Sequence, residues 1–323
     1  MMKLMKLYKL AKKLFNCQNL LGYRRVIVFI IRSLWHYREV QGLHDFFSDN
    51  LFRQDLITKY PPFFSQLTRQ VFYKKSSTAE RFALITQHFS ILEDLFTKSA
   101  LQQMYLGPGL LLWSEQYKEQ TLAMDLAFSI LEYREGLLTL GLKLDGAYIY
   151  HINFWLSFDE QHNLSMYIGA LQGSPGGLNI NKELTKHFFG YRPKNLIMTA
   201  ARVIVQLLSV NKIYAVSNYG FYANNHFRRD RILKTSLDTF WTEIEGNLSL
   251  DRRFFNLPVI EHRKNIEEVV SHKRNLYRKR FAVLDKISAD ITSALVTFME
   301  NSTTARELAI GISKRIFHAD VSL

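Results

Sequence analysis

The chain has 323 residues, with 42 Lys and Arg against 29 Asp and Glu, and carries a formal net charge of +13 at pH 7. Hydrophobic residues make up 47% and charged residues 22%, a composition that excludes a mostly disordered chain and is typical of a globular protein. The single cysteine, Cys17, excludes an internal disulfide and any zinc or iron–sulfur site built from several cysteines.

The first 15 residues have the pattern of a basic amphipathic helix, with lysines from Lys3 to Lys13 on one side and apolar residues on the other. Such a helix can bind an anionic bilayer surface, where each lysine contributes about 1 kcal/mol. A helix docked on the body of the protein, with its lysines in water, has the same pattern. The apolar side consists of Leu4, Leu7, Tyr8, Ala11, Leu14 and Phe15.

The early apolar runs are too short to span a bilayer, which takes about 20 residues. The longest of them, 26–31, is flanked by arginines, and the lysines up to Lys13 interrupt the stretch that a secretory signal would keep apolar. We therefore expect a cytoplasmic protein, which would lie peripherally on the inner membrane if its first helix binds lipid.

Helical spacing of apolar residues predicts that residues 1–125 form a helical region. The clearest stretch is 79–96, where Phe82, Ile85 and Phe89 recur on one face. Breaks are predicted at Pro61-Pro62 and at 107–109, because proline and glycine end helices.

The pattern changes after Glu135 to short β-rich runs at 137–144, 147–158 and 164–171. The Asp145-Gly146 turn and a polar turn separate them, which predicts an antiparallel meander. A glycine-rich bend then leads into a long helical segment over 182–210 with a kink at Pro193, a strand over 212–217 and a helix over 225–245. This order predicts a parallel crossover, and hence an α+β fold in which the helical region packs on a mixed-sheet domain over 126–323.

The order of these elements resembles the core of the GNAT acyltransferases. In that family the acyl-thioester lies along the splayed end of the fourth strand, and backbone N–H groups at the following turn hold its pyrophosphate. The resemblance implies acyl-CoA or acyl-carrier protein as the donor. Pro175 has no N–H to give, so a simple turn is the alternative. The residues that correspond to the cofactor-binding turn are Gln172, Gly173, Ser174, Gly176 and Gly177.

Several short motifs occur in order within about residues 110 to 285. They are IGALQG at 168–173, LTK at 184–186, GYRPK at 190–194, AVSN at 215–218, DTFWTE at 238–243, FNLP at 255–258 and SHKRNLYRKR at 271–280. In this order they resemble the VirK/YbjX family of bacterial envelope and virulence-associated proteins. The resemblance implies a link to outer-membrane integrity, to surface virulence factors and to resistance against cationic peptides.

Four cations are candidates for anion binding. Lys186 and Arg192 lie on or near the helix after the bend, with Lys186 expected in its first two turns, where it could meet a phosphate. An interhelix salt bridge is the commoner use of Arg192. Lys273 and Arg274 begin a basic run that suits a phosphate-rich ligand, and a solvated face paired with neighbouring glutamates is the alternative.

Acyl transfer to an amine needs a base and commonly a proton donor for the leaving thiolate. Glu135, before the first strand of the meander, and His226 are the candidate bases, and Tyr219 and Tyr222 are the candidate donors. Each is more often structural. The ten histidines lack the spacing of metal ligands, so we expect no metal site, and the absence of a nucleic-acid-binding motif disfavours nucleic acid as a partner.

Two functions are compatible with the sequence. One is the transfer of an acyl group from acyl-CoA or acyl-carrier protein to an amine or hydroxyl acceptor. The other is a non-enzymatic peripheral membrane factor that binds an anionic membrane surface and supports outer-membrane integrity or the localisation of a surface virulence protein. The residues leave the acyl chain, the acceptor and the oligomeric state open.

Overall fold

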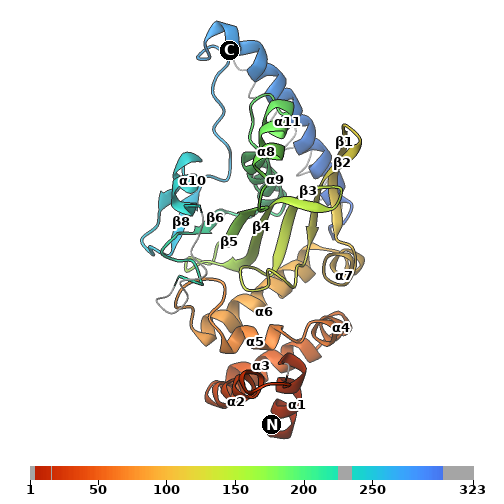
Figure 1. Ribbon diagram of the computed structural model, residues 1–323, viewed down its shortest axis with the longest axis vertical. Helices are drawn as coiled ribbons and strands as arrows, with labels where there is room; N and C mark the ends of the chain where they lie inside the picture. Colours follow the sequence, from red (N-terminus) through yellow and green to blue (C-terminus); the bar gives the residue numbers. More distant parts are fainter. Residues whose placement is uncertain (1–3, 16, 225–234, 301–323) are drawn as a thin grey trace.

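The computed structural model describes residues 4–15, 17–224 and 235–300 (Figure 1). Helices gather at the N-terminal end of the long axis, and the sheet with its own helices forms the rest. The elements before the sheet are α1 (Leu4–Leu14), α2 (Leu20–Trp35), α3 (Tyr37–Ser48), α4 (Leu51–Lys59), α5 (Phe63–Thr68), α6 (Thr78–Leu95) and α7 (Lys98–Leu106). The elements that follow are β1 (Leu110–Tyr117), β2 (Gln120–Ala127), β3 (Leu138–Leu144), β4 (Ala147–Phe158), β5 (Leu164–Gly173), α8 (Leu178–His187), α9 (Pro193–Leu207), β6 (Lys212–Val216), α10 (Leu237–Glu243), β7 (Asn247–Leu248), β8 (Phe254–Leu257) and α11 (Ser271–Val296).

The N-terminal helices begin at side-chain caps that the sequence supplies. Asn19 and Asn50 cap α2 and α4, and Ser77 with Glu80 forms a capping box at the start of α6. Helix α6 joins the helices to the sheet, because the Leu156 N–H of β4 donates to Nδ1 of the buried His88 at 3.0 Å. The other ring nitrogen of His88 lies 2.7 Å from the Tyr105 hydroxyl of α7.

The sheet has eight strands in the order β1-β2-β3-β4-β5-β6-β8-β7. All neighbouring pairs are antiparallel except β5 and β6, which are parallel and pair from Ser165 with Lys212 to Ile168 with Ala215. From Ala170 to Gly173, β5 continues alongside β4 after its pairing with β6 has ended. The predicted meander, the parallel crossover and the α+β class are therefore confirmed.

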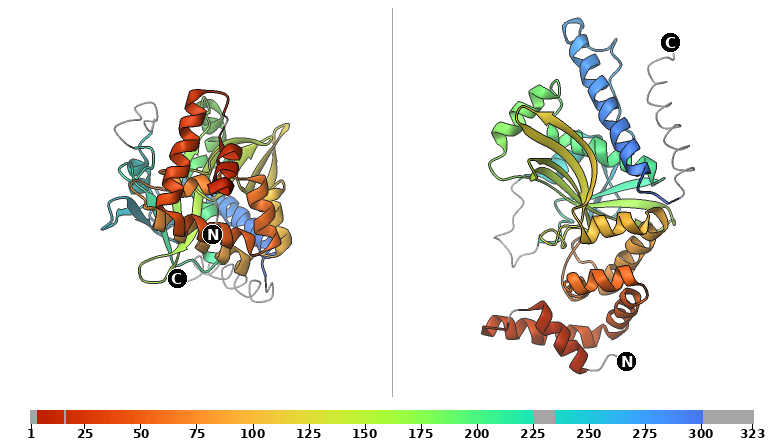
Figure 2. Two further views of the ribbon diagram at one scale, coloured as in Figure 1. Left: turned by 90° about the horizontal axis from the view of Figure 1, so that it is seen from below. Right: turned by 90° about the vertical axis from the view of Figure 1, so that its right-hand side faces the viewer.

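Helices α9 and α11 lie together on one face of the curved sheet (Figure 2). Helix α9 packs against β3 and β4, and α11 packs on α9 and β1. Most residues of α9 are buried, and four of its polar residues, Asn195, Thr199, Arg202 and Gln206, recur at helical spacing along one side. The core of the protein thus lies between α9 and the sheet and continues into the N-terminal helices.

The helical prediction for the last part of residues 1–125 is wrong, because the chain from Leu110 forms β1 and β2. Leu122, Met124 and Leu126 are buried at alternate positions, which is the period of a strand. A short apolar run fits a helix and a strand equally well in the sequence, and pairing with β3 decides the outcome.

The long helical segment predicted over 182–210 is two helices. Phe189 and Gly190 have φ of 51° and 81°, values that end α8, and Pro193 then begins α9 at the position where proline is favoured. The helix predicted over 225–245 is present as α10 from Leu237, and residues 225–234 lie outside the described part of the chain.

Candidate functional site

Helix α2 presents a stripe of large apolar side chains to solvent. These residues recur at helical spacing, so they share one face, and the exposed fractions of Leu20 and Trp35 at its two ends are 89% and 83%. On α1, Leu4, Met5 and Tyr8 are exposed as well. Contiguous exposed apolar surface of this kind marks an interaction site. We call the α2 stripe the residues Leu20, Tyr23, Ile27, Ile31, Leu34 and Trp35.

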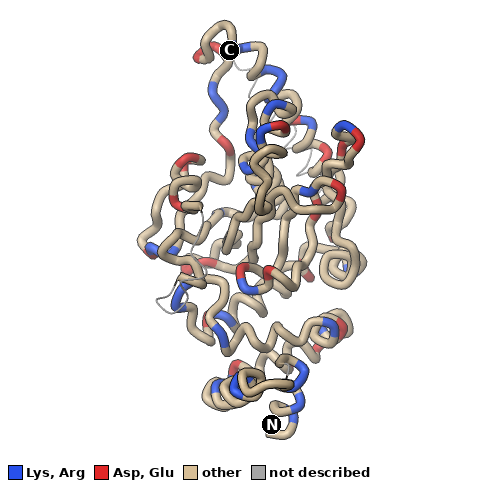
Figure 3. Tube along the Cα trace, viewed as in Figure 1, with Lys and Arg blue, Asp and Glu red and all other residues tan. Residues whose placement is uncertain are grey.

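The surroundings of the α2 stripe are cationic. Residues 1–38 contain no Asp or Glu, and Figure 3 shows Lys and Arg along α1 and α2 at this end of the molecule. Leu7 and Ala11 of α1, and Phe15 directly after it, are buried, whereas the lysines from Lys6 to Lys13 are exposed. Helix α1 is therefore docked through part of its apolar side, while Leu4 and Tyr8 stay in solvent.

The glycine-rich bend joins β5 to α8, as predicted, and part of its backbone is bonded within the protein. Ser174 N–H donates to the Ile149 carbonyl at 3.0 Å, and Gly177 N–H donates to the Ser174 carbonyl at 3.2 Å. Gly176 has a φ of 75°, which favours glycine. Cofactor binding at this bend stays a prediction.

The four candidate cations, Lys186, Arg192, Lys273 and Arg274, differ in position and in hydrogen-bond partners. Helix α8 begins at Leu178, so Lys186 lies in its last turn, and the prediction that placed it in the first two turns is wrong. Arg192 forms an ion pair with Glu243 of α10, which is the interhelix alternative. Arg274 donates to the carbonyls of residues 267 and 269 at 3.0 and 2.9 Å, and Lys273 is exposed in the first turn of α11.

Two predicted site residues, Glu135 and Gln172, are in contact. The buried Glu135 carboxylate accepts hydrogen bonds from Nδ2 of Asn153 at 3.1 Å and from Nε2 of Gln172. Thr139 Oγ1 donates to Asn153 Oδ1 at 2.8 Å and fixes the orientation of that amide. This cluster places one carboxylate beside the end of β5, where the GNAT resemblance expects the donor.

His151 lies next to this cluster, opposite Gln172 in the register of β4 and β5. It is buried, and neither ring nitrogen has a hydrogen-bond partner within the described residues. Burial lowers the pKa of His151 to about 4, so the ring is neutral at pH 7. Among the residues that the structure describes, no group of three or more His, Cys, Asp or Glu is arranged to hold a metal ion.

The predicted proton donors lie in different environments. Tyr219 is exposed, and Nζ of Lys74 lies 4.1 Å from the centre of its ring. Tyr222 is buried and lines a pocket, and His226 lies outside the described residues. The segment that carries both tyrosines is held by the motif residue Asn218, whose N–H donates to Asp238 Oδ1 at 2.6 Å.

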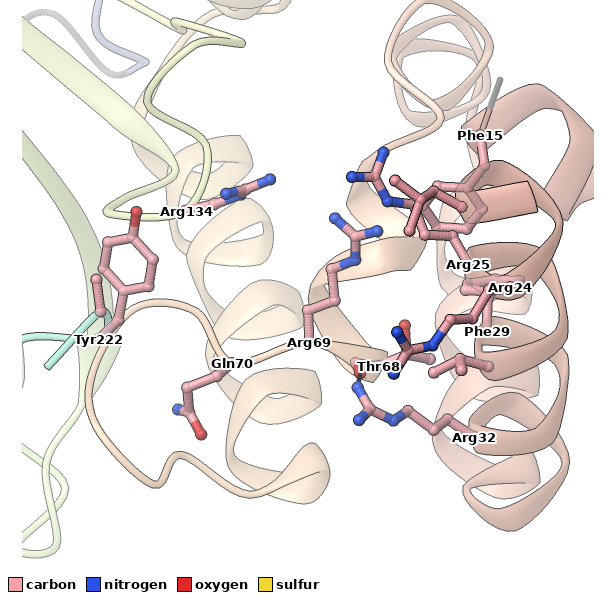
Figure 4. Close-up of a pocket in the computed structure, with 13 residues that line it drawn as sticks. Phe15, Arg24, Arg25, Phe29, Arg32, Thr68, Arg69, Gln70, Arg134 and Tyr222 are labelled. Atoms are coloured by element: carbon pink, nitrogen blue, oxygen red, sulfur yellow. Dashed lines mark hydrogen bonds between the residues drawn. The ribbon is translucent and has the colours of Figure 1, made fainter. Parts of the chain in front are cut away.

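The pocket that Tyr222 lines has a volume of about 650 Å³ and lies between α2 and the body of the protein (Figure 4). Figure 4 shows side chains from α2 on one side and Arg69 and Arg134 on the other reaching into the same space. We call it the arginine pocket, because five arginines line it. Its full lining is Phe15, Leu21, Arg24, Arg25, Val28, Phe29, Arg32, Thr68, Arg69, Gln70, Arg134, Tyr222 and Ala223.

Backbone and ring contacts position three of these arginines. Nη1 of Arg32 donates to the Thr68 carbonyl at 2.7 Å, which joins α2 to the end of α5. The Arg69 guanidinium lies 4.8 Å from the centre of the Phe15 ring. The Arg134 carbonyl accepts from Phe72 N–H at 2.7 Å, so the chain at Arg134 is tied to the segment that precedes α6.

Tyr222 was among the predicted site residues, and Arg24, Arg25 and Arg32 are the arginines that flank the apolar run 26–31, whereas Arg69 and Arg134 were not predicted. Both are single arginines in connecting segments, with no repeated spacing. One local signal could have indicated Arg134. It directly precedes the candidate base Glu135 in the loop between β2 and β3, and loops commonly carry binding residues.

None of the helices that the structure describes is both long enough and apolar enough to cross a bilayer. A family model described as "Protein of unknown function (DUF535)" matches residues 20–293. The chain belongs to the DUF535 family. The matched DUF535 region includes α2, the sheet and all five arginines of the pocket.

The DUF535 chain is similar to "Uncharacterized protein YbjX" of Escherichia coli, with 28% identity over 244 residues, 74% of this chain and 73% of that protein. It is also similar to an "Uncharacterized protein" of Haemophilus influenzae, with 26% identity over 225 residues, 68% of this chain and 72% of that protein. These matches confirm the VirK/YbjX resemblance. No solved structure matches the chain.

Proposed function

We propose that this DUF535 protein is a non-enzymatic peripheral membrane factor that binds anionic bilayers through α1 and α2. The observation that carries the proposal is the α2 stripe, an exposed apolar face at the end of the molecule where residues 1–38 supply lysines and arginines and no acid. Acting on the cytoplasmic face of the inner membrane, it would support outer-membrane integrity or the localisation of a surface virulence protein, as the family resemblance implies.

The energetic terms favour lipid over water for this surface. Burying one large apolar side chain contributes about 1.5–3 kcal/mol when it is fully removed from water, and each lysine near anionic headgroups adds about 1 kcal/mol. Ile27 and Ile31 are more than half exposed on one face, so insertion into the headgroup region would bury both together. The apolar term gives affinity and the cationic term makes that affinity depend on anionic lipid and on salt.

Vesicle co-sedimentation tests the proposal with the full-length protein. Wild type should sediment with vesicles that contain phosphatidylglycerol, and binding should fall with pure phosphatidylcholine or with added salt. The double variant Ile27→Ser/Ile31→Ser should weaken binding roughly tenfold or more, because two inserted side chains are lost. The matched control is Leu250→Ser/Ile260→Ser, which removes two exposed apolar side chains elsewhere on the chain.

Two results would refute the membrane proposal. One is wild-type binding that is the same with and without anionic lipid. The other is an equal loss of binding in the Ile27→Ser/Ile31→Ser variant and in the Leu250→Ser/Ile260→Ser control.

Acyl transfer is the second candidate, and the strand arrangement favours it. Strands β5 and β6 are parallel and stop pairing after Ile168 and Ala215, and in the GNAT acyltransferases the donor lies where the corresponding strands separate. Glu135 would be the base, and acyl-CoA or acyl-carrier protein the donor. A donor at 100 times its Kd should stabilise the protein by about 2.7 kcal/mol in a thermal-shift assay. The absence of a shift with coenzyme A, acyl-CoAs and acyl-carrier protein would remove this candidate.

A further inference from the structure

Among the described residues, no Asp or Glu forms an ion pair with the five arginines that line the arginine pocket. Arg32 donates to a carbonyl and Arg69 lies over an aromatic ring, and neither contact removes charge. Burying or crowding charges without a partner costs free energy, and an anionic ligand would offset that cost.

The arginines also repel one another. Burial lowers the pKa of Arg69, and the charges of Arg134 and Arg25 lower it further, with Tyr133 acting in the opposite sense. Arg25 lies on α2, Arg69 follows α5 and Arg134 precedes β3. The repulsion among these three charges therefore arises from the folded pocket and not from one stretch of sequence. Burial lowers the pKa of Arg81, and the charge of Arg32 lowers it further, while Tyr73 and Glu80 act in the opposite sense.

The size and the donors of the pocket fit a small phosphorylated group. A volume of about 650 Å³ lies within the range of sites for small ligands, roughly 300–1,000 Å³. Guanidinium groups bind phosphate oxygens through paired N–H donors, and several of them can surround one diphosphate. A single carboxylate would offset one of these charges, whereas a diphosphate offsets several. The Tyr222 hydroxyl, directed toward Arg134 in Figure 4, adds a polar group at the wall.

We propose that the arginine pocket binds a ligand with a diphosphate or with paired phosphate groups. The phosphates can belong to a membrane lipid or to a soluble metabolite. Leu21 and Val28 of α2 also line the pocket and are exposed, so a lipid headgroup in it could extend its chains along α2. The lipid source rests on the proposed membrane function, whereas phosphate binding itself does not.

Calorimetric titration of the full-length protein with inorganic pyrophosphate, at fixed ionic strength and without vesicles, tests the proposal. Wild type should bind pyrophosphate. Arg25→Gln and Arg69→Gln should each weaken binding roughly 10- to 100-fold, the loss expected for one charge-assisted hydrogen bond. Arg25 is exposed, so Arg25→Gln should stay folded even if Arg69→Gln, which loses the Phe15 contact, does not.

The matched controls are Arg38→Gln and Arg252→Gln, which remove an exposed arginine outside the pocket. They should bind pyrophosphate as wild type does. The proposal is overturned if wild type fails to bind pyrophosphate, or if the controls weaken binding as much as Arg25→Gln does, since binding would then follow net charge and not the pocket.

A second titration distinguishes the two phosphate sources. Short-chain diacylglycerol diphosphate, below its micelle concentration, should displace pyrophosphate and bind more tightly if the ligand is a lipid. If pyrophosphate alone binds, the ligand is a soluble phosphate compound. Either result supports the pocket, and neither depends on whether the α2 stripe binds vesicles, so this proposal and the membrane proposal can fail separately.

Discussion

The backbone of Glu135 lies directly on Gly169 of β5: a Cβ atom at Gly169 would be 1.8 Å from the Glu135 carbonyl oxygen. Glycine at this position lets the segment before β3 cross β5 closely enough for the Glu135 carboxylate to reach Gln172. The same segment carries Arg134 into the arginine pocket. The close packing at Gly169 therefore positions both Glu135, beside Gln172, and Arg134, in the arginine pocket.

Gly169→Ala should destabilise the protein by about 3 kcal/mol or more, at the upper end for inserting an atom into a packed site, because the clash is with backbone. Urea denaturation measures the effect. Gly42→Ala is the control, since its Cβ would meet only the ring edge of Phe82 and it lies within α3. Equal stability of Gly169→Ala and wild type would show that the two backbones do not touch.

His151 should make stability depend on pH in a known direction. Its pKa is lowered by burial from 6.5 to about 4, so the unfolded chain takes up a proton below pH 6.5 that the folded chain does not. Stability from this group is fully present above pH 6.5 and is lost as the pH falls toward 4. His88 acts in the same direction, with a pKa of about 3.

His151→Leu removes this proton uptake without breaking a described hydrogen bond of the ring. Between pH 6.5 and 4 the stability of the variant should therefore fall less steeply, by up to about 1.4 kcal/mol per pH unit. Denaturation measured at several pH values gives the two slopes. Parallel slopes would mean that the ring has the same protonation in both states.

Arg192 and Glu243 form an ion pair between exposed side chains, with 43% and 42% of their surface accessible. A pair of this kind contributes about 0–1 kcal/mol, so Arg192→Ala and Glu243→Ala should each cost little stability. A double-mutant cycle measures the coupling. If Arg192→Ala abolished a coenzyme A thermal shift that Glu243→Ala retained, Arg192 would be a ligand contact and not a structural partner.

Local signals predicted much of the sheet. Asp145 and Gly146 have φ of 46° and 79°, as the hairpin signal required, and β4 has the predicted bounds. The prediction was wrong where neither a turn residue nor the spacing of apolar residues distinguished a helix from a strand or marked the start of a helix. The run from Leu110 was assigned to helix, and the start of α8 was placed four residues late, which moved Lys186 to the wrong end of the helix.

The candidate site was predictable only where its residues are close in sequence to an element end. Glu135 and Gln172 could be named because each borders a strand, but their contact depends on Gly169 and could not be read from spacing. The arginine pocket joins Arg32, Arg69 and Tyr222, which are far apart in the chain. Their convergence is set by tertiary packing of α2 on the segment after α5, for which no local pattern exists.

Tryptophan fluorescence with vesicles tests membrane binding through the α2 stripe most directly. Trp35 is 83% exposed, whereas Trp113, Trp155 and Trp241 are at most 5% exposed, so a change in emission on binding reports Trp35. We expect phosphatidylglycerol vesicles to shift the emission to shorter wavelength, brominated lipid to quench it, and Trp35→Phe to abolish both effects. Emission that stays unchanged while the protein co-sediments with the vesicles would show that the α2 stripe does not enter the membrane, and would contradict membrane binding through this helix.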